Sequence, residues 1–387
     1  MKVVKLNIIF VLSVLCLKAY SQDTILVFYA NEQLKELYIG RVVQNDTIKN
    51  GSYEFYSPSG FLMQKGNFLN NHLQGNYYIF YANGKLKSQL HFEEGLRNGA
   101  FKNWDAYGRL YQEGFYERDA LHGKLTTYGT DNKPLIKSEY KKGKKNGLEL
   151  IYQNGLVKSR IAYLGDTING LYETFYDDGN LNYRGRMEGS KYVDSLFVFY
   201  ASGDIMRKCN YVNGQIEGAF LSYYENSRIS KRTTYKNGQA EGLFIEYFPD
   251  GSIAQKGNYE QNKKTGLWQA FYPGGALFSE GYFKDNLFDG LWTIYFESGQ
   301  AKQVGTYRKG KATGLWSYYH PNGNLWKRGY YFNDKQQGLW RFYNEQGELE
   351  SIILFQHGQT QGMAWVFFDG SLQPIYTLNG EVFQLIE

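Results

Sequence analysis

The fold of this chain is decided by the stretch Gly266-Leu267-Trp268-Gln269-Ala270-Phe271-Tyr272-Pro273-Gly274-Gly275-Ala276-Leu277. A short run with aromatic residues is followed by a turn that ends in glycine, and a second run then opens with an aliphatic residue. Alternation of apolar and polar residues is typical of a β-strand with two different faces. Glycine at the turn tolerates the positive φ that a tight hairpin needs. The stretch therefore predicts a β-hairpin.

This hairpin is one unit of a tandem repeat with a period of about 24 residues. Unit starts fall at Gly51, Gly75, Gly99, Gly123, Gly147, Gly170, Ser195, Gly218, Gly242, Gly266, Gly290, Gly314, Gly338 and Gly362. The spacing is uniform except around Gly170 and Ser195, where it is one residue short or long. A degenerate earlier unit at Phe28-Tyr29-Ala30-Asn31 resembles Phe80-Tyr81-Ala82-Asn83, so it is expected to form an N-terminal cap.

Two positions in the unit predict how neighbouring hairpins pack. Two residues past the start most units carry an aromatic residue, at Tyr53, Tyr77, Phe101, Tyr172, Phe197, Phe220, Phe244, Trp268, Trp292, Trp316 and Trp340. Later in the unit a glycine often lies two residues before another aromatic, at Gly66, Gly114, Gly185, Gly257, Gly281, Gly305 and Gly329. The missing side chain leaves room for a ring from an adjoining strand.

Composition supports the same interpretation, with 44 Gly, 36 Tyr and 26 Phe but only 6 Pro. Aromatic and turn-forming residues together favour many short strands, and no segment has a helical pattern. A lone hairpin is marginally stable in water, so each unit must stack on its neighbours. The expected fold is all-β, an elongated antiparallel array of hairpins.

The recurring Gly-Leu-Trp-x-x-Tyr, Asn-Gly-x-Leu and Asn-Gly-x-x-x-Gly elements resemble the bacterial MORN-repeat-variant family. The resemblance covers nearly all of the chain after the first residues. It implies consecutive hairpins in an open meander sheet. Bacterial members often carry the label antitoxin-like, which implies neutralisation of a toxin as one possible activity.

The first residues predict export. Lys2 and Lys5 precede a short apolar core, and Ala19-Tyr20-Ser21 offers small residues where a signal peptidase cuts. A buried helix or a membrane anchor is the alternative, but the apolar run is shorter than the roughly 20 residues that span a bilayer. The predicted organisation is a signal peptide at 1–21, a capping repeat at 22–50 and tandem repeats with a C-terminal cap at 51–387. A periplasmic or cell-surface location follows.

Charge and cysteine content limit the partners. Export would lower the net charge from +5 to about +2, with charges interspersed along the chain. No nucleic-acid partner is therefore expected, and the lack of Lys/Arg clusters argues against membrane association. Cys209 would be the single cysteine left, so no internal disulfide is possible. It occupies a small-residue position and is expected to fill space, with an intermolecular disulfide as the alternative.

No motif predicts catalysis. The five histidines, His72, His91, His122, His320 and His357, lack partners at metal-ligand spacing, and no nucleophile elbow or phosphate-binding loop is present. No catalytic residue, metal site or cofactor is therefore predicted, and the chain is expected not to be an enzyme. Asp23-Thr24, Asp46-Thr47, Asp166-Thr167 and Asp194-Ser195 resemble an O-glycosylation signal; a turn copied with the repeat is the alternative.

The tryptophan series gives the candidate site. It could be a stacked ladder that only stabilises the sheet, or an exposed aromatic face that binds a glycan or a protein. The candidate binding face comprises Trp268, Trp292, Trp316, Trp340, Phe244 and Phe220. The predicted function is a non-enzymatic binding scaffold for a protein or an envelope polymer. An antitoxin-like immunity protein and a membrane-lipid-associated protein are the alternatives.

Overall fold

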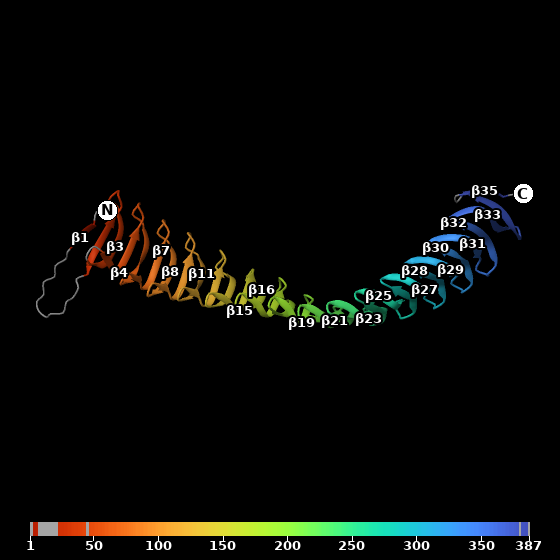
Figure 1. Ribbon diagram of the computed structural model, residues 1–387, viewed down its shortest axis with the longest axis horizontal. Helices are drawn as coiled ribbons and strands as arrows, with labels where there is room; N and C mark the ends of the chain where they lie inside the picture. The colour runs from red at the N-terminus through yellow and green to blue at the C-terminus, as the bar shows by residue number, and fades with distance from the viewer. Residues whose placement is uncertain (1–2, 7–21, 44–45, 379–380, 386–387) are drawn as a thin grey trace. The chain divides into compact units, whose positions relative to one another are not determined.

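The computed structural model describes residues 3–6, 22–43, 46–378 and 381–385. Its regular elements in these ranges are all β-strands, and strands that follow each other in the chain pair antiparallel. The predicted all-β meander is confirmed. The chain divides into two units, Met1–Lys191 and Tyr192–Glu387, and Figure 1 shows hairpins side by side in chain order within each.

Unit 1 contains β1 (Val3–Leu6), β2 (Asp23–Phe28), β3 (Leu34–Val43), β4 (Asp46–Tyr56), β5 (Leu62–Leu69), β6 (His72–Leu73), β7 (Gly75–Phe80), β8 (Leu86–Glu93), β9 (Leu96–Arg97), β10 (Gly99–Trp104), β11 (Leu110–Glu117), β12 (Ala120–Leu121), β13 (Gly123–Tyr128), β14 (Pro134–Lys141), β15 (Lys144–Gln153), β16 (Leu156–Leu164), β17 (Thr167–Phe175) and β18 (Leu181–Glu188).

Unit 2 contains β19 (Lys191–Phe199), whose first residue is the last of unit 1, β20 (Ile205–Val212), β21 (Gln215–Tyr223), β22 (Ile229–Lys236), β23 (Gln239–Tyr247), β24 (Ile253–Glu260), β25 (Lys263–Phe271), β26 (Leu277–Lys284), β27 (Leu287–Tyr295), β28 (Ala301–Arg308), β29 (Lys311–Tyr319), β30 (Leu325–Phe332), β31 (Lys335–Tyr343), β32 (Leu349–Gln356), β33 (Gln359–Phe368), β34 (Ser371–Leu378) and β35 (Glu381–Leu385).

The repeat has one register, seen in the hairpin of β25 and β26. Trp268 lies opposite Gly281, which in turn lies opposite Trp292 of β27. In unit 2 a β-bulge lies at this glycine in the pairing with the next strand, as between Gly281 and Phe283 or between Val304 and Thr306. Bulges bend a strand and increase its twist, so each hairpin curves around its ring. We call the face with Trp268 and Gly281 the core face, and the opposite face with Leu267 and Glu280 the outer face.

The uneven spacing near Gly170 has a structural cause. The hairpin of β15 and β16 turns through only Asn154 and Gly155, both with positive φ. Most other repeats use a five-residue loop, as between Phe271 and Leu277, and this repeat is one residue short. The hairpin of β33 and β34 also turns through two residues, Asp369 and Gly370. The predicted start at Ser195 is wrong by one residue. In the next repeat the start, Gly218, lies opposite Tyr235, and the residue in the equivalent place opposite Tyr211 is Asp194. Asp194 has a φ of 59°, the left-handed conformation that glycine adopts at the other starts.

The N-terminal region forms its own hairpin. In β2 and β3, Ile25 lies opposite Tyr38, and both are buried, at 2% and 5% exposure. Val3–Leu6 forms β1 and pairs with β2, whereas the rest of the predicted signal peptide lies outside the described residues. Cleavage of that segment remains a prediction.

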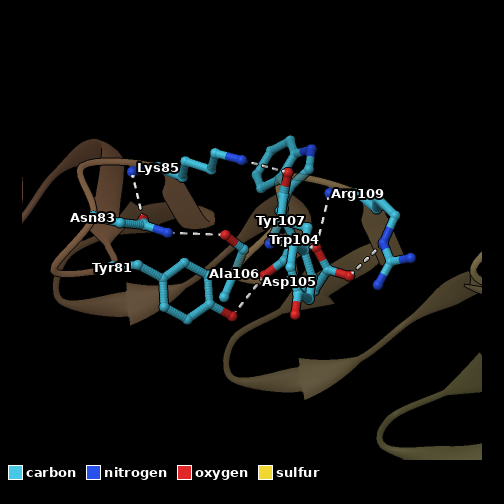
Figure 2. A network of polar contacts seen from close by, with 8 residues as sticks. All are labelled: Tyr81, Asn83, Lys85, Trp104, Asp105, Ala106, Tyr107 and Arg109. Carbon is cyan, nitrogen blue, oxygen red and sulfur yellow. Dashed lines mark hydrogen bonds and ion pairs between the residues drawn. The ribbon is translucent and has the colours of Figure 1, made fainter.

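Loops stack from one repeat to the next, as Figure 2 shows. The Tyr81 hydroxyl donates to the carbonyl of Trp104 (2.9 Å), and Asn83 Nδ2 donates to the carbonyl of Ala106 (2.9 Å). The same tyrosine bond recurs from Tyr200, Tyr224 and Tyr272, each to a carbonyl in the next repeat. These bonds couple neighbouring repeats at the loop edge of the sheet.

The opposite edge has a second ladder built by Asn and Asp. Asn286 accepts from the backbone N–H of Lys264 through Oδ1 (2.6 Å) and donates its own N–H to the Lys264 carbonyl (3.1 Å). Asn262 and Asp334 make the same pair of bonds to Ala240 and Ala312. Where both ladders are present, a repeat is therefore hydrogen-bonded to the next at both edges. Stability of such an array is approximately a sum over interfaces between repeats.

Candidate functional site

Rings on the core face cover the glycines that the repeat places beside them. A Cβ built on Gly257, Gly281, Gly305 or Gly329 would overlap the indole of the tryptophan eleven residues later. At Gly66 the overlap is with Tyr77, 2.5 Å from the built Cβ to Cδ2. The predicted role of these glycines is confirmed, since only a residue without a side chain lets the ring lie against the strand.

The candidate aromatic binding face is buried on the core face. Trp340, Trp316, Trp268 and Phe244 are only 0%, 2%, 4% and 7% exposed, and Trp292 and Phe220 are half-buried. The rings pack edge-on against the aromatic that closes each hairpin, with Phe283 between Trp268 and Trp292 at 5.8 and 5.6 Å. None of these six residues forms an exposed face, because the curved hairpin closes around them. Their geometry is that of a stabilising ladder.

Residues other than glycine occupy the same position in some repeats, among them Cys209 and Thr233. Cys209 lies opposite Leu196, is 2% exposed and makes no disulfide. Burial raises the pKa of its thiol above the ordinary value. Thr233 lies between Phe220 and Phe244 and is 4% exposed. Cys209 therefore fills space in the core face, as the sequence predicts.

One repeat of unit 1 replaces the ring with a polar cluster. Glu149 occupies the ring position at 5% exposure, accepts from the Ser138 hydroxyl at 2.6 Å and pairs with Lys145. Burial pushes the pKa of Glu149 up, but the hydrogen bonds from Lys145 and Ser138 outweigh it and hold the pKa below its ordinary value. A carboxylate with a lowered pKa is a weak proton acceptor. The cluster therefore has the character of a buried ion pair.

The outer face of unit 2 carries exposed apolar residues at the repeat period. The residue after each unit start is Leu243, Leu267, Leu291, Leu315 or Leu339, with exposures of 50%, 40%, 55%, 47% and 43%. Tyr282 and Tyr330, 49% and 58% exposed, lie opposite Leu267 and Leu315. We call the five leucines and two tyrosines the leucine row. Polar Asn258 and Thr306 lie opposite Leu243 and Leu291, so the row alternates between apolar pairs and single leucines. Extensive exposed apolar surface marks interaction sites in soluble proteins.

The position of the leucine row follows from the sequence pattern of the repeat. Gly-Leu-Trp recurs with a glycine at the turn into the strand, a leucine next and a tryptophan third. Neighbouring residues of a strand point to opposite faces. With the ring on the core face, the leucine must lie on the outer face.

Histidines and turn acids have local roles. His91 Nδ1 lies 3.0 Å from Asn76 Oδ1, and His320 Nε2 lies 3.0 Å from the carbonyl of Tyr343. Among the residues that the structure describes, no group of three or more His, Cys, Asp or Glu could hold a metal ion. Asp166 of the predicted glycosylation motif accepts from the Lys145 N–H at 2.7 Å, which places this motif in the edge ladder. Across these same ranges, no helix has the length and apolar character to cross a membrane.

Register, ladders and period together define a β-hairpin repeat protein. Seven of its segments match the MORN repeat variant, at residues 73–94, 216–237, 240–261, 264–285, 288–309, 312–333 and 336–357. Six of the seven follow one another in unit 2, where each spans most of one hairpin and the turn after it. No curated protein matches the chain.

Three solved structures match over 93% of this chain with low identity. They are the crystal structure of TcdB2-TccC3-TEV (12% identity, TM-score 0.17), TcdB2-TccC3 without its hypervariable C-terminal region (10%, 0.16) and a mutant Tc holotoxin pore of Photorhabdus luminescens (11%, 0.15). The chain spans 25%, 24% and 27% of their lengths.

Proposed function

We propose that this protein is a non-enzymatic binding scaffold that holds a protein partner along the leucine row, in the periplasm or at the cell surface. The observation that carries the proposal is the exposure of five leucines in five consecutive repeats, at 40–55% each. A polar residue at these positions would leave the core face unchanged, since the leucines do not point into it. Their exposure is therefore explained by a partner that covers them.

The repeat geometry suits an extended partner better than a small molecule. Leucines recur every second strand, about 10 Å apart at the usual strand spacing. A partner that follows the row gains one apolar contact per repeat, and burying a leucine side chain contributes about 1.5–3 kcal/mol. Affinity would then depend on how many repeats the partner spans.

The test is crosslinking of the intact exported protein in native envelope fractions, followed by identification of what it captures. The triple variant Leu267→Asn, Leu291→Asn and Leu315→Asn is expected to lose the captured protein. A matched control carries Leu69→Asn, Leu156→Asn and Leu164→Asn, which are 53%, 43% and 58% exposed but lie near turns of unit 1. Equal capture by wild type and the first variant would contradict the proposal.

The same experiment separates the alternative functions. An immunity protein would capture a toxin through the leucine row. A lipid-associated protein would instead sediment with vesicles and yield no protein at the row, an outcome that rejects a protein partner.

A further inference from the structure

A second row of residues crosses the outer face of unit 2 beside the leucine row. It runs through consecutive strand pairs in the order Phe197, Lys208, Leu221, Arg232, Ile245, Lys256 and Gln269. Each residue lies opposite the next, so the row is continuous across seven strands. We call Lys208, Arg232 and Lys256 the cation row.

No carboxylate neutralises the cation row. Lys208 and Arg232 are exposed and Lys256 is half-buried. The Nζ atoms of Lys208 and Lys256 lie 5.5 and 5.6 Å from the rings of Phe197 and Phe271. Within the described part of the chain, none of the three cations has an acidic side chain at ion-pair distance. The residues between them are Leu221 and Ile245, which carry no charge.

In unit 1 most cations at the equivalent strand positions form an ion pair with a carboxylate. Lys65 pairs with Glu54 at 3.2 Å, and Lys102 pairs with Glu113 at 3.5 Å. Arg160 and Arg184 share Glu173, at 3.4 and 2.7 Å. Lys137 is the exception, since it lies opposite Thr126 and Leu150. The three consecutive unpaired cations are thus a feature of unit 2, not of the repeat in general.

Neutral hydrogen-bonding residues run alongside the cation row. Asn210, Thr234 and Asn258 lie two residues further along the same strands, on the same face, and all three are exposed. Amide and hydroxyl groups of this kind can both donate to and accept from ligand hydroxyls. A ligand lying across the strands would therefore meet a cation and a neutral polar group in each repeat.

The nearest carboxylates are held by other partners or lie outside the row. Glu217 lies opposite Asn210 and accepts from the backbone N–H of Asn237 (2.7 Å), and Glu241 accepts from the backbone N–H of Gln261 (3.0 Å). Glu280 lies opposite Gln269, one strand beyond the row, and accepts from Gln269 Nε2 at 3.0 Å and from the Tyr295 hydroxyl at 2.8 Å. Glu260 lies at the far end of β24, two residues beyond Asn258. The row from Phe197 to Gln269 itself therefore carries three positive charges and no negative charge.

We propose that the cation row binds a linear acidic polysaccharide that bears one carboxylate per disaccharide. Cations recur every second strand, about 10 Å apart, a distance comparable to the length of two pyranose rings. Each carboxylate would pair with one cation, while sugar hydroxyls would meet Asn210, Thr234 and Asn258. The sugar between two acidic sugars would lie over Leu221 or Ile245.

Charge spacing and side-chain type disfavour a nucleic acid. Phosphates follow each other at about 3.4 Å along one strand of a duplex, much closer than the cations. Single strands are usually bound by stacking of bases on exposed aromatic rings, whereas aliphatic side chains separate these cations. The row therefore fits a sparsely charged polymer best.

The inference goes beyond the proposed function, because the polymer would use residues outside the leucine row. The probe is hyaluronan, in which a uronate alternates with a neutral sugar, titrated into the full-length protein and followed by calorimetry at low and moderate salt. Dextran, an oligothymidylate and phosphatidylserine vesicles are titrated in parallel. Binding of hyaluronan that weakens with salt, with no binding of dextran, is expected.

The triple variant Lys208→Gln, Arg232→Gln and Lys256→Gln is expected to bind hyaluronan at least tenfold more weakly. The control Lys65→Gln and Lys102→Gln should bind as wild type, because those lysines already face acids. Leu267→Asn, Leu291→Asn and Leu315→Asn should also bind as wild type, which separates this site from the proposed protein site. Circular dichroism confirms that each variant is folded.

Three outcomes would overturn the inference. The first is that hyaluronan does not bind, and the second is that the cation-row variant binds it as wild type does. The third is that the oligothymidylate or the vesicles bind as tightly as hyaluronan through the same three cations.

Discussion

Trp316 lies so close to Gly305 that a Cβ on residue 305 would overlap its indole ring. The two residues are eleven positions apart on adjacent strands, and Trp292 lies opposite the same glycine from the other side. Because this arrangement recurs at Gly257, Gly281 and Gly329, the C-terminal unit is built from one contact used repeatedly. Its energetics can be tested one repeat at a time.

Gly305→Ala is expected to destabilise the protein by about 1–3 kcal/mol, the usual cost of overpacking. The new methyl group displaces the indole of Trp316, which is only 2% exposed. Urea unfolding followed by tryptophan fluorescence measures the change. Thr306→Ala, next in the chain but on the outer face, is the control and should change stability little. Equal stability of both variants would show that the ring has room to move.

Trp340→Ala should cost about 3–5 kcal/mol, because it removes a fully buried ring and leaves a cavity. Trp326, which is 42% exposed, provides the matched control. Its replacement by alanine should cost far less in the same urea titration. A similar loss for both variants would contradict the assignment of Trp340 to the core.

The loop ladder predicts a smaller effect. Tyr272→Phe removes the hydroxyl that donates to the Tyr295 carbonyl at 2.9 Å, and a typical hydrogen bond contributes about 1 kcal/mol. We expect a loss of that size in thermal or urea unfolding. Tyr107→Phe is the control, since this side chain is 77% exposed. If Tyr272→Phe is neutral, the hydroxyl ladder does not couple the repeats.

Sequence reasoning predicted the period, the hairpins and the pairing of rings with glycines, because each depends on residues close in the chain. It placed one unit start at Ser195, because an aspartate is not expected at a position that glycine occupies in most units. Asp194 nevertheless has the positive φ of those glycines. Burial of Trp340 could not be predicted, because it depends on how strongly bulges curve the hairpin. That curvature decides whether the aromatic rings are buried as a stabilising ladder or exposed as a binding surface.

The cation row could not be predicted from local sequence motifs either. Lys208, Arg232 and Lys256 are each 24 residues apart, so no window of sequence contains a cluster. Strand pairing brings them together with Leu221 and Ile245. Comparing the repeats position by position, in place of searching for local motifs, would have found them.

The polar cluster of unit 1 predicts acid sensitivity. Hydrogen bonds from Lys145 and Ser138 hold the pKa of Glu149 below its ordinary value of 4.5, despite burial that pushes it up. A carboxyl whose pKa is lower in the folded state stabilises that state above the ordinary pKa, and this stability is lost as pH falls through the folded pKa. The free energy of unfolding should therefore drop as the pH falls below the ordinary pKa of the carboxyl and through its lower folded-state pKa.

Glu149→Gln tests this origin, because glutamine keeps the shape of the side chain but does not titrate. The variant should be less stable at pH 7, where Lys145 loses its buried partner, and should lose less stability than wild type on acidification. Glu260→Gln, which removes an exposed carboxyl at the end of β24, should follow the wild-type curve. Parallel pH curves for wild type and Glu149→Gln would mean that other carboxylates govern acid unfolding. If the two stability curves instead converge at low pH, the acid sensitivity of the protein arises from the Lys145–Glu149 ion pair.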